Sequence, residues 1–146
     1  MSNFKIRPVM LSILLFAGFG AAEVRAGGGA NAGAATAQAN SAIQGVGACE
    51  VANRGQALID CVGNTMASLS QGLSFAARGL APELATLAAK ASEIRGKPKA
   101  EARLTLNGVI AIYNGLRAKS ASDIRPVIDA VGKAFDSALR AVERRG

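Results

Sequence analysis

The two cysteines, Cys49 and Cys61, are the residues of this chain whose spacing most directly suggests chemistry. On one unbroken helix their Cα atoms would be about 18 Å apart, because a helix rises about 1.5 Å per residue. A disulfide needs a Cα separation of about 4.4–6.8 Å. The chain must therefore reverse direction between them for a bond to form. We expect that turn at Asn53-Arg54-Gly55, since Asn and Gly tolerate left-handed backbone conformations.

A bond between Cys49 and Cys61 could be catalytic or structural. Oxidoreductases usually separate their two cysteines by two residues at a helix N-terminus, which lowers the pKa of the attacking thiol. Eleven residues separate this pair, so the spacing does not fit that pattern. We therefore predict a structural disulfide.

The absence of histidine excludes several kinds of site. Histidine is the usual general base and the commonest metal ligand. Without it, catalytic groups of the Ser-His-Asp and Cys-His type are impossible. Two cysteines without histidine make a zinc site unexpected. In the chain that would remain after removal of a signal peptide, haem could use only Met66, Tyr113 or the cysteines, and no Cys-x-x-Cys-His motif is present. We accordingly expect no catalytic, cofactor-binding or metal-binding residues, and we predict that the protein is not an enzyme.

Carboxylates leave one enzymatic alternative, a histidine-free hydrolase that uses Asp60 or Glu50. Asp60 adjoins Cys61, but the simpler interpretation is an exposed acid in the first turn of a helix. Nothing specific in the sequence supports catalysis by either residue.

Two further classes of ligand lack their usual motifs. The run Gly27-Gly28-Gly29 follows no strand and precedes no Lys-Ser/Thr pair, so it does not form a phosphate-binding loop. Phe75, Tyr113 and Phe135 are isolated and occupy expected core positions rather than alternating with basic residues. We expect no specific nucleic-acid binding.

Residues 1–26 have the pattern of a cleaved signal peptide. A basic start with Lys5 and Arg7 precedes fourteen residues of mostly apolar sequence, Val9–Ala22, which is shorter than the ~20 residues of a spanning helix. The sequence Val24-Arg25-Ala26 favours cleavage after Ala26, with cleavage after Ala22 as the alternative. We therefore expect a periplasmic or secreted protein, in an oxidising compartment where a disulfide persists.

The remaining 120 residues suit one small domain. Residues 27–40 contain only Gly, Ala, Asn, Thr and Gln, so we expect them to form a flexible linker. Residues 41–146 are the predicted helical domain, beginning with a short helical piece near Ser41.

Apolar residues recur three or four positions apart after the turn, which predicts an all-α fold. We expect a small antiparallel bundle of about four main helices joined by short loops. The first helix should carry Ile59, Val62, Met66, Leu69, Leu73, Ala76 and Leu80 and end near Arg78-Gly79; the second, from Pro82, should carry Leu84, Leu87, Ala91 and Ile94. The third, about residues 98–118, should carry Leu104, Leu106, Val109, Ile110, Tyr113 and Leu116; the last should carry Ile124, Val127, Ile128, Val131, Phe135, Ala138, Leu139 and Val142.

Polar and small residues add two expectations for the last two helices. Gly108 and Gly115 lie seven residues apart, so they either permit the close approach of a neighbouring helix or are merely tolerated. The pairs Asp129–Lys133 and Asp136–Arg140 place an acid four residues before a base, which stabilises a helix by a few tenths of a kcal/mol.

Basic charge is concentrated in the C-terminal half. The chain has a formal net charge of +7, and residues 90–146 hold twelve basic and six acidic side chains. Our first hypothesis is a non-enzymatic protein of the bacterial cell envelope or exterior that acts by protein–protein binding or scaffolding. The alternative is a peripheral membrane-surface protein whose basic amphipathic helices contact anionic lipid or another polyanion. The usual explanation of such mixed charge is solubility.

Overall fold

The computed structural model describes residues 28–77, 79 and 81–146, and this part of the chain is helical with no strand. The all-α prediction is therefore confirmed. Residues 1–26, interpreted above as a signal peptide, lie outside the described residues, as do Gly27, Arg78 and Leu80. Five α-helices and two short 3-10 helices follow one another: α2 (Gly28–Ala52), α3 (Gly55–Ala76), α4 (Pro82–Ala91), η2 (Ser92–Ile94), α5 (Lys99–Lys119), η3 (Ser122–Ile124) and α6 (Arg125–Arg145).

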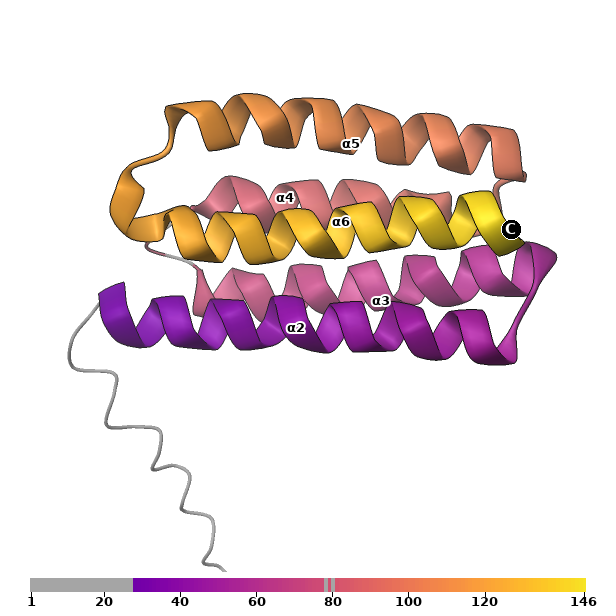
Figure 1. Cartoon of the computed structure of the whole chain (residues 1–146), viewed down its shortest axis with the longest axis horizontal. Coiled ribbons are helices and arrows are strands. Elements are labelled where there is room, and N and C mark those ends of the chain that lie inside the picture. Colours follow the sequence, from indigo (N-terminus) through magenta and orange to yellow (C-terminus); the bar gives the residue numbers. More distant parts are fainter. Residues whose placement is uncertain (1–27, 78, 80) are drawn as a thin grey trace, which may run out of the picture.

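The helices form an antiparallel bundle in which α5 is the outermost element (Figure 1). Helix α2 packs against α3 and α6, α3 packs against α4, and α5 packs mainly against α6 and α4. Consecutive helices run in opposite directions, whereas the first and last, α2 and α6, lie side by side in the same direction. One side of α5 therefore faces the bundle and the other faces outward.

The prediction of a flexible linker over residues 27–40 is wrong, because most of this segment belongs to helix α2. The helix begins at Gly28 and continues unbroken to Ala52, so the helical region starts well before Ser41 and has five main helices rather than four. Its buried residues recur three or four positions apart: Ala35, Ala39, Ala42, Val46 and Cys49. Alanine has the highest helix propensity and loses no rotamer freedom when it is buried. A face of small side chains can thus pack closely although it contains few large apolar residues.

Glycines on both helices bring α2 and α3 close together. A Cβ atom added at Gly45 would lie 3.0 Å from the Thr65 methyl group. At Gly72 the Gln38 side chain already occupies the place that a Cβ would take. The segment expected to be a flexible linker therefore forms part of a helix that packs in the bundle.

The expected apolar stripes of α3, α4 and α6 form most of the core. Six of the seven stripe residues expected on α3, from Ile59 to Ala76, are buried, and the seventh, Leu80, is outside the described residues. The stripe expected on α4 and η2 is buried throughout, from Leu84 to Ile94. On α6 the buried stripe runs from Val127 to Val142, while Leu139 of α6 and Ile124 of η3 are half-buried. Long amphipathic segments are thus where the sequence pattern predicts burial well.

Helix α5 differs from its predicted packing. Its buried residues are Ala102, Leu106, Val109 and Tyr113. Leu104, expected on the same apolar face, is 72% exposed. Successive residues on a helix are separated by about 100°, so Leu104 and Leu106 differ by roughly 200° and cannot both face the core.

Candidate functional site

The disulfide between Cys49 and Cys61 is present, with the two Cα atoms 5.7 Å apart. The chain reverses at the predicted turn, where α2 ends at Ala52 and Gly55 starts α3 with a left-handed φ of 63°. Cys49 is buried and Cys61 is half-buried. The bond therefore fastens the C-terminal end of α2 to the first turns of α3, which is the role of a structural cross-link.

Both carboxylates considered for catalysis have structural partners. Asp60 accepts hydrogen bonds from the Gly96 backbone N–H at 2.8 Å and from the Gln56 amide at 3.1 Å. The Gly96 hydrogen bond is the main reason that the pKa of Asp60 lies below its usual value, with Gln56 adding to the effect. Asp60 thus ties the start of α3 to the turn before α5.

Glu50 lies at the end of the bundle where α2 and α6 finish. Both of its oxygens lie 2.9 Å from Nη2 of Arg144, and its side chain is only 19% exposed. The adjoining hollow, of about 620 Å³, is lined by Gly47, Glu50, Val51, Arg54, Arg144 and Arg145. Since this ion pair joins α2 to α6, Glu50 has a structural role: it holds the ends of these two helices together.

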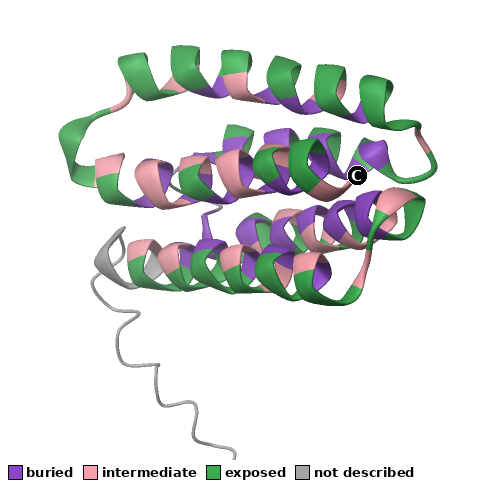
Figure 2. Ribbon diagram, turned by 45° about the vertical axis from the view of Figure 1, so that its right-hand side comes forward, coloured by how far each residue is buried: buried purple, intermediate pink, exposed green. Residues whose placement is uncertain are grey.

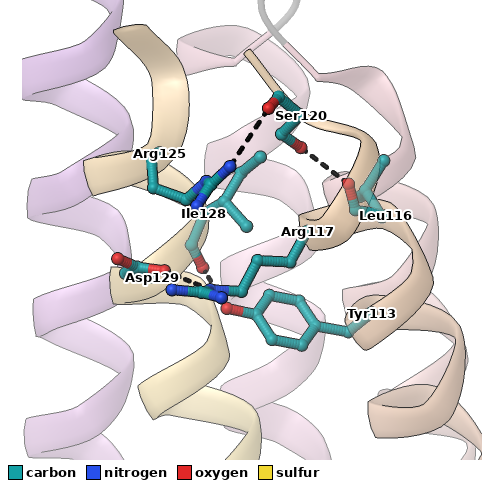
Figure 3. Close-up of polar contacts among 7 residues, drawn as sticks. All are labelled: Tyr113, Leu116, Arg117, Ser120, Arg125, Ile128 and Asp129. Atoms are coloured by element: carbon teal, nitrogen blue, oxygen red, sulfur yellow. Dashed lines mark hydrogen bonds and ion pairs between the residues drawn. The ribbon is translucent and has the colours of Figure 1, made fainter. Parts of the chain in front are cut away.

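A cluster of hydrogen bonds fixes the end of α5 against the start of α6 (Figure 3). The Tyr113 hydroxyl donates to the Ile128 carbonyl at 2.8 Å, and Arg117 pairs with Asp129 at 2.6 Å. The loop between the helices is held by Arg125, which donates to the Ser120 carbonyl at 3.2 Å. These contacts set the position of α5.

Electrostatics within this cluster follow from its contacts. Burial is the main cause of the raised pKa of Tyr113, and the nearby Asp129 carboxylate raises it further. The hydrogen bond from Arg117 lowers the pKa of Asp129 and raises that of Arg117. Asp129 therefore pairs across helices rather than with Lys133, whereas the predicted Asp136–Arg140 pair forms at 3.0 Å.

The outward side of α5 is exposed along the helix (Figure 2), and it carries large apolar residues. Leu104 is 72% exposed and Ile112 is 53% exposed. Gly108, Ala111 and Gly115 are also exposed. At 100° per residue, all five residues fall on one side of the helix. We call this set, Leu104, Gly108, Ala111, Ile112 and Gly115, the outer α5 face.

The two glycines of this face do not serve packing within the bundle. A Cβ atom added at Gly108 or Gly115 would meet nothing within 4 Å. Of the two interpretations of this pair, the close approach of a neighbouring helix is therefore not seen within the described chain. The face borders a groove of about 310 Å³ between α4 and α5, lined by Glu83, Leu87, Ile112, Gly115, Leu116 and Lys119.

Sequence reasoning missed the outer α5 face because it assigned Leu104 to the core and did not single out Ile112. The spacing of Leu104, Gly108 and Ile112 was the available signal. These residues lie four apart and therefore share a side of the helix, opposite to Leu106 and Tyr113.

The described residues also bear on metal binding and on membrane insertion. The described residues contain no group of three or more His, Cys, Asp or Glu side chains placed to hold a metal ion. Among the helices that the structure describes, none is both long enough and apolar enough to cross a membrane.

No protein-family model, curated protein or solved structure matches this chain.

Proposed function

We propose that this protein is exported and acts without catalysis, by binding a protein chain through the outer α5 face in the bacterial cell envelope or outside the cell. The observation that carries the proposal is the exposure of Leu104 and Ile112 on one side of a helix whose other side is already packed. Export rests on the signal-peptide pattern of residues 1–26 and on the Cys49–Cys61 disulfide.

The regularity of this face distinguishes it from scattered surface hydrophobics. Single exposed apolar residues are normal on soluble proteins, and Val51 on α2 is one of them. Leu104 and Ile112 instead lie eight residues apart in one i, i+4 row of α5, with Gly108 between them. A helix from a partner protein could pack along such a row.

Membrane-surface binding is the weaker alternative. It is favoured by the basic C-terminal half, where Lys97, Lys99 and Lys119 lie in or beside α5. Interfacial helices usually insert bulky aromatic residues, and the outer α5 face has none. Co-sedimentation with vesicles containing anionic lipid, at low and high salt, tests this alternative: a bound fraction at low salt that Leu104→Glu removes would favour it.

Site-specific photo-crosslinking tests the main proposal. A photoreactive phenylalanine analogue is placed at residue 104 or 112, and the full chain is expressed in the organism that produces it. We expect ultraviolet-dependent protein adducts from both positions, because both side chains project from the outer α5 face. Mass spectrometry then identifies the partner.

The control analogue is placed at Lys133, which is exposed on α6 and outside this face. We expect it to give no adduct of the same mass. Absence of protein adducts at 104 and 112 would overturn the proposal, and so would equal labelling from all three positions.

A further inference from the structure

The outer α5 face is complementary to itself, and we infer that its partner is a second copy of this chain, bound with the two α5 helices antiparallel. The inference rests on the proposed function and specifies its partner. It is carried by the positions of two charges and two glycines along α5.

Glu101 and Lys119 supply the charge complementarity. They lie eighteen residues apart, which is five turns and about 27 Å along the helix, so they share one angular position, at the two ends of the outer α5 face. Both side chains are exposed, and within the described residues neither takes part in an ion pair. In an antiparallel pair centred halfway between them, each Glu101 faces the other copy's Lys119. A two-fold axis therefore creates two ion pairs at once.

The same register places a large side chain opposite a glycine. Ile112 lies as far to one side of the midpoint as Gly108 lies to the other, so each Ile112 faces the second copy's Gly108. Leu104 likewise faces the region of the second copy's Gly115. Because nothing lies within 4 Å of a Cβ at either glycine, both positions have room for an incoming side chain. The four contacts are thus of the knob-and-hole kind.

Three other helix glycines have a neighbour that fills the place of their missing side chain, whereas Gly33 and Gly47 of α2 have, like Gly108 and Gly115, nothing within 4 Å. Arg95 covers Gly63, Gln38 covers Gly72, and Tyr113 covers Gly132. A glycine inside a helix costs about 1 kcal/mol relative to alanine. Gly108 and Gly115 incur that cost with no contact inside the bundle, and a second α5 helix supplies one.

The expected dimer is concentration-dependent. Helix α5 has 21 residues and is roughly 31 Å long. One pair of helices covers less surface than the ~1,600 Å² of a standard stable interface. We therefore expect monomer and dimer to exchange rather than a permanent assembly.

Sedimentation velocity of the disulfide-bonded chain, across a wide range of concentrations, tests the inference. We expect a reversible shift from monomer to dimer. Glu101→Lys alone and Lys119→Glu alone should each raise the dimer dissociation constant about tenfold or more, since each reverses both ion pairs. The double variant Glu101→Lys/Lys119→Glu should restore dimerisation, and mixing the two single variants should restore it as a heterodimer.

Matched controls change the same charges away from α5. Glu93→Lys and Lys90→Glu alter exposed residues of η2 and α4 and should leave the dissociation constant unchanged. Gly108→Gln gives an independent arm, because it should stabilise the monomer and abolish the dimer. A dimer that tolerates Gly108→Gln, or single variants that the double variant does not rescue, would overturn the proposed register.

The crosslinking experiment separates this inference from the function that it specifies. Adducts at residue 104 with twice the mass of the chain support both. Adducts with a different protein, combined with a monomer at every concentration, support protein binding and overturn self-pairing. A monomer without any adduct overturns both.

Discussion

The helix glycines of this protein differ in whether another side chain fills the place where their Cβ atom would lie. At Gly132 the Tyr113 hydroxyl occupies the place where a Cβ would lie, so the missing side chain lets Tyr113 reach the Ile128 carbonyl. The ring of Tyr113 also meets that of Phe135 edge to face, with centroids 5.9 Å apart. Gly47 on α2 has no neighbour within 4 Å of its Cβ position and supports no such contact.

Gly132→Ala should therefore destabilise the protein although alanine is the better helix former. The new methyl group displaces Tyr113 and breaks its buried hydrogen bond, and we expect a loss of about 1–2 kcal/mol in the free energy of unfolding. Gly47→Ala, the matched control, should be neutral or stabilise by up to about 1 kcal/mol. Urea denaturation of both variants measures the difference; equal effects at the two positions would contradict this account.

Helix α2 shows what an apolar stripe of small residues does at the scale of an element. Its first buried positions, Ala35, Ala39 and Ala42, follow the same three-four spacing as the leucines and isoleucines of α3. A search for large apolar side chains at this spacing detects the stripe of α3 and misses the alanine stripe of α2. The helical character of residues 28–40 was available in the spacing and propensity of alanine, but the contact of Gln38 with Gly72 across the two helices was not.

Helix α5 shows that the buried face of a helix can be predicted from the sequence but its long-range polar contacts cannot. Its register could be predicted from Leu106, Val109 and Tyr113, which are buried as expected. The outward position of Leu104 followed from helix geometry, whereas the clamp between Arg117 and Asp129 did not, because nothing in the local sequence favours it over Asp129–Lys133. Long-range side-chain partners are thus the part of the candidate site that one sequence leaves open.

Aspartate substitutions at neighbouring alanines test whether α2 is a packed element. Ala39→Asp places a charge at a fully buried position and should cost about 3 kcal/mol or more in the free energy of unfolding. Ala37→Asp changes an exposed position of the same helix and should cost less than about 1 kcal/mol. Thermal melts of the two variants give the comparison. If residues 27–40 were a flexible linker, both substitutions would be neutral.

The described part of the molecule is closed by contact between its first and last helices, α2 and α6. Helices α2 and α6 pack along their length, and their C-terminal ends meet at the basic hollow beside Glu50. This contact joins residues that are far apart in the sequence, so its formation closes a long loop of chain. Glu50 and Arg144, separated by 94 positions, mark the junction.

The energetic coupling between Glu50 and Arg144 measures that closure. A double-mutant cycle with Glu50→Ala and Arg144→Ala should give a coupling of about 1 kcal/mol, because Glu50 is only 19% exposed and meets Nη2 of Arg144 through both oxygens. The same cycle on Asp136 and Arg140, whose side chains are 50% and 64% exposed within one helix, should give about 0.3–0.5 kcal/mol. Both cycles use the free energy of unfolding in urea at low salt. A coupling at Glu50–Arg144 no larger than that of the exposed pair would show that the junction is held by the apolar contacts of α2 and α6 alone.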